Sequence, residues 1–440
     1  MRRLLALLAA LPVALPLAAQ DTTQVQEGVR VGVDYRPGTR PSLIVIPGAG
    51  LDTLRAVVRR DLDFSDRFEM IAVADSAPAS AGSRPGGGTA PGINYGLYKL
   101  YGAEFAVELT EASGGVTARL HDLNLNRVRS QQTVPLPSAT DPGYRLEVHR
   151  LADEITRWAS GTPGIAASRL LFVSGGRVYR ADSDGEEISA LTPAGATALS
   201  PVWAPDGQRF AFTRLEGGRG GILIQSLTGA TVVTPGTETA LNITPAFSPD
   251  GRLLAYAHSD ERGTDIFTAN AVDRCCAQRL TVGRFADNLS PTFSPDGRRI
   301  AFISTRAGPP QLYVMAANGT DQELLAPFDY GATGSSNAPE WSPDGANVVF
   351  HREVSRSPQL FVVDVAGRRV RQLTSAGRNE DPTWAPDGRH IAFISDRSEQ
   401  RQIWIIDIET GRVRQLKTPG AARLPAWSRR LGRSAVPTTP

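Results

Sequence analysis

The sequence predicts a small N-terminal α/β domain followed by an all-β six-bladed β-propeller. The main observation is a five-residue turn that repeats along the second part of the chain. Each copy has an aromatic residue, then Ser or Ala, then Pro-Asp-Gly, and the copies are Trp203–Gly207, Phe247–Gly251, Phe293–Gly297, Trp341–Gly345 and Trp384–Gly388. They recur every 43 to 48 residues, a period typical of propeller blades. Short alternating apolar runs follow each turn, which indicates four strands per repeat.

The residue types of this turn explain why a strand should end there. Proline has no backbone N–H and cannot continue a ladder, aspartate accepts hydrogen bonds from the backbone that follows, and glycine adopts positive φ. A decayed sixth copy begins at Trp427. The runs between 170 and 191 lack an inner strand, and Leu424–Trp427 is an inner strand without partners. We therefore expect residues 165–430 to close as six blades, with the C-terminal strand inside the first blade.

Residues 42–160 alternate between apolar strands and amphipathic helices. The segment Leu51–Leu62 places apolar side chains on one helical face, and Tyr144–Ala159 does the same. Between them we expect a strand at Phe68–Val73, a short helix at 94–101, and a hairpin across Gly114-Gly115 with a third strand at 128–134. This pattern predicts the α/β domain, which ends at a hinge around residues 161–164.

The chain begins with the features of a secretory signal. Residues 1–19 contain Arg2-Arg3, an apolar stretch and a small-residue end near Ala19, where we expect cleavage. Residues 20–41 are expected to form an extended arm, in which Val29-Arg30-Val31-Gly32-Val33 alternates like a short strand. Residues 74–92 are a Gly- and Ser-rich insertion, and residues 431–440 a loose tail. No later apolar run is long enough for a membrane span, so we expect a secreted protein without direct membrane insertion.

Composition excludes some functions and leaves others open. The 440 residues carry a formal charge of +2 and no basic run, so nucleic-acid binding is not indicated. The five histidines lack metal-ligand spacing, and no Gly-x-Ser-x-Gly elbow occurs, so we expect neither a metal, a cofactor nor an enzyme. Two adjacent cysteines, Cys275 and Cys276, are either bridged or free.

The residues just before each aromatic turn are candidates for a binding ring. They begin the inner strands, near the expected mouth of the channel, and include Leu241, Asn242, Thr244, Asn288, Leu289 and Ser290. One interpretation is structural, because Asn, Asp and Pro start strands and satisfy backbone groups. The other is a ring of small polar and apolar groups that suits a protein or peptide ligand. The second interpretation places Asn242 and Leu289 at open rim positions.

The whole chain after the signal resembles the TolB family, the periplasmic propeller proteins of the Tol–Pal system. The resemblance rests on the aromatic-Ser-Pro-Asp-Gly turns together with Val29–Asp34 as the mature start, Leu43–Pro47 with its following helix, Tyr101–Val107, and Pro425–Ser428 as the closing strand.

The resemblance implies a non-enzymatic, monomeric adaptor that supports outer-membrane integrity and constriction during cell division. A TolA-like inner-membrane protein would bind the arm at Val29, Arg30, Val31, Gly32 and Val33. A Pal-like peptidoglycan-associated lipoprotein would bind the channel face, where family contact positions fall on Leu241, Asn242, Thr244, Asn288, Leu289 and Ser290. Two alternatives remain: a secreted propeller enzyme of the lyase or lactonase type, and a generic propeller that binds peptides or glycans.

Overall fold

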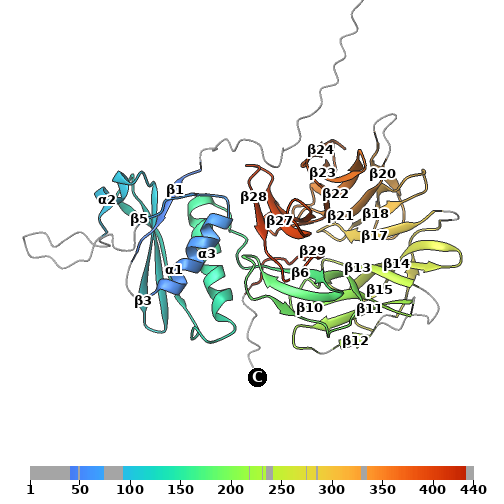
Figure 1. The fold of residues 1–440 in the computed structure, drawn as a ribbon, viewed down its shortest axis with the longest axis horizontal. Coiled ribbons are helices and arrows are strands. Elements are labelled where there is room, and N and C mark those ends of the chain that lie inside the picture. Colours follow the sequence, from blue (N-terminus) through green and yellow to red (C-terminus); the bar gives the residue numbers. More distant parts are fainter. Residues whose placement is uncertain are drawn as a thin grey trace, which may run out of the picture.

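The computed structural model shows an α/β unit beside a ring of β-sheets (Figure 1). It describes residues 40–47, 50–73, 93–217, 219–229, 231–233, 241–273, 275–283, 286–328 and 334–432. The expected signal (1–19), most of the arm including Val29–Val33, the insertion 74–92 and the tail from 433 lie outside these residues. Within the described part, no helix has both the length and the apolar character needed to cross a bilayer.

The N-terminal unit is a five-stranded mixed sheet in the order β2-β1-β3-β4-β5. Its strands are β1 (Ser42–Val45), β2 (Glu69–Met70), β3 (Phe105–Ala112), β4 (Gly115–Asp122) and β5 (Arg127–Pro135). β1 runs parallel to β2 and β3, and β3, β4 and β5 are antiparallel. The helices are α1 (Asp52–Phe64), α2 (Tyr95–Leu100) and α3 (Tyr144–Ser160).

Helices α1 and α3 share a core with one face of this sheet. The core contains the apolar stripe of α1 (Leu54, Val58 and Leu62), and Ile155 of α3. Each such side chain contributes about 1.5–3 kcal/mol when it is fully buried, so the amphipathic pattern dictates which helix face meets the sheet. Helix α3 ends at Gly161, whose φ of 83° a residue with a side chain would adopt only with strain.

Four of the propeller sheets are separate and have four strands each. Their inner strands are β29, β17, β21 and β25, and the sheets run outward in the orders β29-β6-β7-β8, β17-β18-β19-β20, β21-β22-β23-β24 and β25-β26-β27-β28. The bounds are β6 (Arg169–Ser174), β7 (Arg177–Asp182), β8 (Ser189–Ala190), β17 (Asn288–Phe293), β18 (Arg299–Ser304), β19 (Gln311–Ala316), β20 (Glu323–Ala326), β21 (Ser336–Trp341), β22 (Asn347–Val354), β23 (Ser357–Asp364), β24 (Val370–Gln372), β25 (Asn379–Trp384), β26 (His390–Ser395), β27 (Gln402–Asp407), β28 (Val413–Leu416) and β29 (Ala422–Trp427).

The other two predicted repeats share one larger sheet, so four separate blades are present where six were expected. Its strands are β9 (Ala198–Trp203), β10 (Arg209–Glu216), β11 (Arg219–Ser226), β12 (Thr231–Val233), β13 (Leu241–Phe247), β14 (Leu253–Asp260), β15 (Gly263–Asn270) and β16 (Gln278–Arg279). The two halves meet through a parallel bridge between Gly220 and Leu241. The two strands come close at this bridge, where Gly220 has no side chain: a Cβ there would lie 2.4 Å from Leu241 Cδ1 and 3.3 Å from the Asn242 carbonyl oxygen.

The C-terminal strand completes the sheet that begins the propeller, as the sequence predicted. β29 pairs antiparallel with β6, with Ala422 opposite Ser174 and Trp427 opposite Leu170. Trp427 also donates from Nε1 to Ser168 Oγ at 2.8 Å. Strands about 250 residues apart in the sequence therefore lie side by side (Figure 1), and the ring has no free edge at this point.

The Pro-Asp-Gly turns have the hydrogen bonds that their residue types predict. Asp296 Oδ1 accepts the N–H of Arg298 at 3.1 Å, and the equivalent aspartates of the other turns do the same. The turn glycines have φ between 64° and 73°. A Cβ on Gly297 would lie 3.5 Å from Pro249, which belongs to the turn of the preceding repeat. The turns thus pack on one another around the ring.

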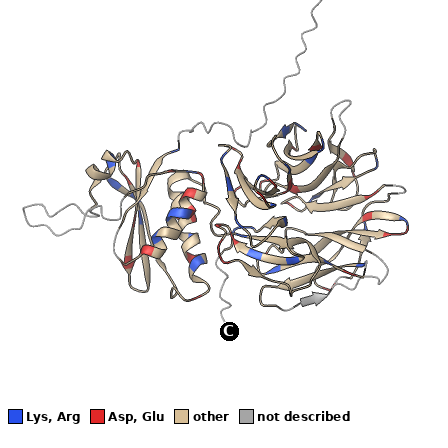
Figure 2. Ribbon diagram, in the orientation of Figure 1, with Lys and Arg blue, Asp and Glu red and all other residues tan. Residues whose placement is uncertain are grey.

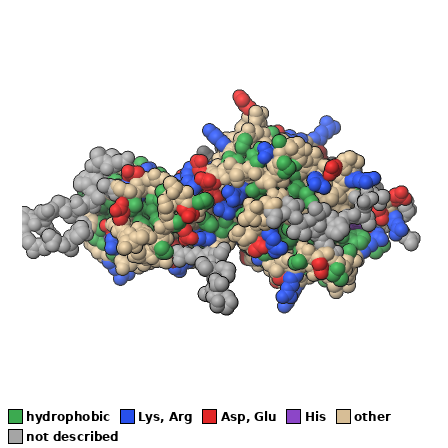
Figure 3. All heavy atoms as spheres, turned by 90° about the horizontal axis from the view of Figure 1, so that it is seen from below, with side chains coloured by type: hydrophobic (Ala, Val, Ile, Leu, Met, Phe, Trp, Pro, Cys, Tyr) green, Lys and Arg blue, Asp and Glu red, His purple; other side chains and the backbone are tan. Residues whose placement is uncertain are grey.

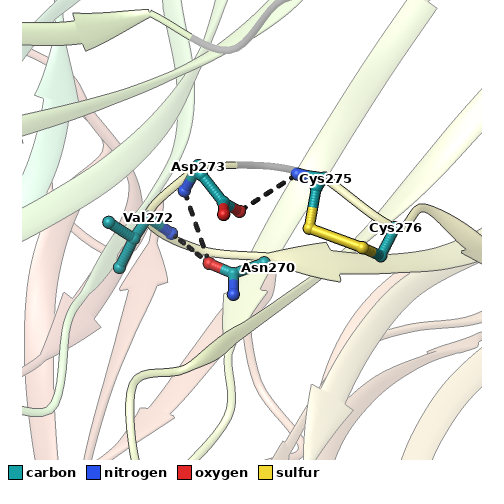
Figure 4. The surroundings of a disulfide bond; sticks show 5 residues. All are labelled: Asn270, Val272, Asp273, Cys275 and Cys276. Carbon is teal, nitrogen blue, oxygen red and sulfur yellow. Dashed lines mark hydrogen bonds between the residues drawn. A yellow bond between two sulfur atoms is a disulfide. The ribbon is translucent and has the colours of Figure 1, made fainter.

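Cys275 and Cys276 are joined by a disulfide, which settles the question that the sequence left open. The pair lies between β15 and β16 (Figure 4). Asp273 Oδ1 accepts the N–H of Cys275 at 3.2 Å, and Asn270 Oδ1 accepts the N–H of Val272 at 2.8 Å. These bonds organise the turn that carries the bridge.

The α/β unit meets the propeller through charged side chains. Figure 2 shows charges of both signs on α1 and α3, the helices that face the ring, and charged side chains of both signs also gather where the two parts meet in Figure 3. His149 of α3 lies between two carboxylates, with Nδ1 2.7 Å from Asp61 and Nε2 3.5 Å from Asp182 of β7. Asp184 accepts from Arg60 and Arg145 at 2.8 and 2.6 Å. Each histidine or arginine here links one part of the molecule to the other.

Candidate functional site

The propeller encloses a cavity of about 840 Å³ along its axis. Residues from all six inner strands line it, and these strands present one equivalent aromatic residue each: Trp203, Phe247, Phe293, Trp341, Trp384 and Trp427. The turn prolines follow the aromatics along the wall, among them Pro249 and Pro295. A cavity of this size matches the range of ligand-binding pockets and can accept a segment of a partner protein.

A repeated backbone distortion forms a second ring in the cavity wall. In each inner strand the residue before the proline has a left-handed conformation, with φ between 47° and 53°; these residues are Ser200, Thr244, Ser290, Ala338, Asp381 and Leu424. The pairing to the next strand shifts register at the same point, which marks a β-bulge. Left-handed conformations of non-glycine residues are uncommon and cost free energy. Their repetition in all six strands shows that the bulge is a property of the repeat.

Thr244 and Ser290 lie in the cavity wall, as the docking interpretation of the sequence requires. They come from neighbouring inner strands, β13 and β17, and the Ser290 N–H donates to Thr244 Oγ1 at 3.3 Å. Leu289 is only partly buried and packs beside the core cluster that contains Phe293. Leu241 is also partly buried, and it makes the bridge to β11.

Asn242 and Asn288 take structural roles, and the expectation of an open rim position is wrong for Asn242. Asn242 is buried, and its Oδ1 lies 2.8 Å from His258 Nδ1. Asn288 is fully buried, and its amide donates to Asp265 Oδ1 at 3.0 Å and accepts from Arg306 at 3.0 Å. The side chain at this position precedes the bulge by two residues and points into the blade, so it satisfies buried polar groups.

The structure adds a group of titratable side chains that the sequence did not single out. Glu340, His351 and Asp381 line one side of the cavity, on β21, β22 and β25. Burial raises the pKa of Glu340 to about 7, although Thr383 and the Trp384 N–H partly offset this. Burial lowers the pKa of His351 to about 4, and its Nδ1 accepts the Asp381 N–H at 3.1 Å.

This group gives the wall hydrogen-bonding side chains whose charged forms are disfavoured by burial. Burial also raises the pKa of Asp381, whose Oδ2 accepts the N–H of Leu424 at 3.4 Å. In the sequence Asp381 stands just before the Trp384 turn, but no pattern there relates it to Glu340 or His351. Perturbed pKa values in a cavity are typical of functional sites but also occur in structural networks.

Two clusters of described residues are close enough to hold a metal ion, and neither lies in the cavity. They are Asp61, His149 and Asp184, and Asp66, His390 and Asp407. Both lie at the interface between the α/β unit and the propeller. Arginines already pair with their carboxylates, as Arg145 does with Asp184 at 2.6 Å. Ion pairing with these arginines therefore accounts for both clusters.

Comparisons with known proteins relate the chain to one family. A family model described as the TolB beta propeller domain matches residues 160–331 and 329–436. A Tol-Pal system protein TolB from Anaeromyxobacter dehalogenans strain 2CP-1 is 32% identical over 296 residues, which are 64% of this chain and 65% of that relative. A protein of the same name from Methylococcus capsulatus is 32% identical over 225 residues, 48% of this chain and 50% of that relative. The matches thus span less than two thirds of the length of these relatives.

A solved structure extends the likeness to almost the whole chain. The crystal structure of TolB from Acinetobacter baumannii superposes with a TM-score of 0.75 at 22% identity, and the alignment covers 89% of this chain and 98% of that one. At this level of identity the likeness concerns the fold. It includes both the sheet with its helices and the ring of β-sheets, since the ring alone could not supply this coverage.

Proposed function

Because the chain belongs to the TolB β-propeller family, we propose that it is a periplasmic component of the Tol–Pal system that works by binding other proteins. The relatives named Tol-Pal system protein TolB support this assignment. On this proposal residues 1–19 are a secretory signal and the mature chain is a monomer. It takes part in maintaining the outer membrane and in constriction during cell division.

We infer that the propeller has six blades, of which two share hydrogen bonds. Six inner strands carry the same bulge, and a single bridge joins the halves of the larger sheet. We further propose the division into an arm at 20–41, an α/β domain at 42–160 and a propeller at 165–430. The clustering of apolar side chains separately in the α/β unit and in the ring supports this division.

The cavity is the single observation that carries the proposed binding of a Pal-like lipoprotein. Thr244 and Ser290 stand beside each other in its wall, which the six aromatic residues of the inner strands also line. Aromatic residues in desolvated pockets are favoured anchors for protein partners. Leu289 and Leu241 are partly buried and are not among the residues that line the cavity, whereas Asn242 and Asn288 would support its wall from within the blades.

A binding role fits the wall better than a catalytic one. Glu340 Oε1 accepts the Trp384 N–H at 3.2 Å, and His351 Nδ1 accepts a backbone N–H. These groups therefore already satisfy parts of the backbone. A general acid or base must instead be free to exchange a proton with a substrate. For this reason we propose that the chain is not an enzyme.

The test is a titration of the purified protein with the periplasmic part of the Pal-like lipoprotein, followed by calorimetry. Ser290→Arg places a large charge in the cavity wall, and we expect affinity to fall ten- to a hundred-fold, or roughly 1.4–2.8 kcal/mol. Thr320→Arg, at an exposed turn after β19, is the matched control and should bind like the wild type. Equal affinity of all three proteins would show that docking does not use the channel.

A second binding site is proposed in the arm, where Val29–Val33 would add a strand to a TolA-like protein. Deletion of residues 20–34 should abolish that binding and leave the melting temperature within about 2 °C, because these residues precede the described core. Calorimetry with the TolA-like domain and a thermal melt measure the two effects. Unchanged binding after the deletion would assign the contact to another surface.

A further inference from the structure

The carboxylate of Asp66 lies at the point where the α/β domain meets the propeller. Oδ1 lies 2.8 Å from Arg412 Nη1, next to β28, and 3.9 Å from Arg40 Nη1, before β1. Oδ2 lies 3.1 Å from His390 Nε2 of β26 and 3.9 Å from Arg414 Nη1 of β28. The side chain of Asp66 is only 5% exposed. One buried anion is therefore shared by cationic side chains from three separate segments.

The backbone around Asp66 is held by the propeller as well. Asp66 follows the end of α1 with φ 53°, a left-handed conformation that aspartate adopts more readily than most residues but still at a cost. Its carbonyl oxygen accepts from Arg389 Nη2 at 3.2 Å. Two residues earlier, the Phe64 carbonyl accepts from Arg414 Nη1 at 3.1 Å, and the guanidinium of Arg414 lies 4.3 Å from the Phe64 ring centre. The turn after α1 is thus held by Arg414 of β28 and by Arg389, which precedes β26.

The contacts of Asp66 continue to the wall of the channel. His390 Nδ1 lies 2.7 Å from Asp387 Oδ2, in the Pro-Asp-Gly turn that follows β25. The preceding residue of that turn, Pro386, lines the cavity together with Trp384. Arg40, which also lies near the carboxylate, stands two residues before β1. Asp66 therefore links the segment that leads into β1 to one blade of the channel.

We propose that the negative charge of the Asp66 carboxylate holds the α/β domain in one orientation on the propeller. Without this negative charge, Arg40, His390 and Arg412 would lose the anion they share, while Asp387 would still pair with His390 and Asp63 with Arg412. The attraction across the interface at this point would therefore weaken, and the mutual repulsion of the cations would be less well compensated. The second ionic group, around His149 and Asp182, would remain. We therefore expect the domain to pivot about that second group and the hinge at 161–164, and not to separate.

Asp63 provides a matched control one turn away. Its carboxylate also pairs with Arg412, at 3.1 Å, but 36% of its side chain is exposed and its other described neighbours do not include His390. Asp63→Asn and Asp66→Asn each remove one negative charge from the end of α1. Removing one partner of an exposed pair changes stability little, whereas removing a buried anion leaves buried cationic groups less well compensated, which costs much more. The two variants separate a general effect of charge from the specific role of Asp66.

The orientation can be read through the only two lysines of the chain, Lys99 in α2 and Lys417 after β28. After the α-amino group is capped, a donor and an acceptor dye on these lysines report the interdomain distance by single-molecule energy transfer. We expect one narrow distribution for the wild type and for Asp63→Asn, and a shifted or broadened one for Asp66→Asn. Hydrogen exchange over residues 64–67 should be about tenfold faster in Asp66→Asn only, equivalent to roughly 1.4 kcal/mol.

Two results would overturn the proposal: a wild-type distribution for Asp66→Asn, or the same change in both variants. If Asp66→Asn does not fold, Arg412→Gln decides the matter, because it removes the 2.8 Å pair but keeps His390 in place. A changed distribution in Arg412→Gln, with Asp63→Asn unchanged, would support the role of Asp66. A wild-type distribution in Arg412→Gln would contradict it.

Discussion

Loss of the proton from His390 should lower the stability of this protein at alkaline pH. Burial opposes the charged imidazolium, but Asp387 and Asp66 outweigh it and raise the pKa of His390 to about 9 from 6.5. The charged groups of Arg389, Arg412 and Asp407 lie around the same site. Since the pKa is higher in the folded state, the stabilisation is complete below about pH 6.5 and is lost as the pH rises through about 9. A shift of this size corresponds to roughly 3 kcal/mol.

Urea unfolding between pH 6 and 10 measures this contribution. In that window the unfolding free energy of the wild type should fall more steeply than that of His390→Asn, by up to about 1.4 kcal/mol per pH unit. His149, whose pKa is raised to about 10 because Asp61 and Asp182 outweigh burial, remains in both proteins and cancels in the difference. Thr320→Ala, at an exposed turn after β19, should keep the wild-type slope. Equal slopes for His390→Asn and the wild type would refute the argument.

The remaining predictions concern the closing strand β29, a buried core side chain and a buried amide within one blade. Truncation after Arg423 removes most of β29 and exposes the edge of β6, so the protein should aggregate or melt without cooperativity in calorimetry; a soluble, cooperative truncation would contradict the closure. Phe393→Ala empties a fully buried position and should cost about 3–5 kcal/mol in urea unfolding, well above the effect at an exposed residue. Asn288→Ala leaves Asp265 and Arg306 without a shared partner and should cost about 1–3 kcal/mol of stability; a loss of Pal affinity alone would instead make Asn288 a docking residue.

Much of the fold follows from local rules that a sequence displays directly. The Pro-Asp-Gly turns at Asp206 and Asp296 form because Pro, Asp and Gly each have one favoured backbone role, and these roles do not depend on distant contacts. The spacing of Leu54, Val58 and Leu62 dictates the buried face of α1 in the same way. The closing strand at Trp427 could be predicted because an unpaired inner strand and an incomplete blade were both visible.

The candidate site was only partly visible in the sequence. Their position in the repeat, just before an aromatic turn, predicted that Thr244 and Ser290 would lie near the channel. It could not tell them from Asn242 and Asn288, because a β-bulge between these positions changes which side chains face the channel. Alternation predicts orientation only while the ladder is regular. The pattern of residue types contains no direct sign of the left-handed residue that creates the bulge.

The tertiary structure alone decided the charge network and the joining of two repeats. Asp66 and His390 are 324 residues apart, and no local pattern relates them, because ion pairing depends on distance in space and on burial. The same applies to Glu340 and His351, whose pKa values depend on how far they are removed from water. Gly220 and Leu241 are 21 residues apart, and their close approach exists only after the neighbouring strand is in place. The residue types therefore determined the turns and the buried helix faces. The ion pairs and the contacts between repeats depended on tertiary packing.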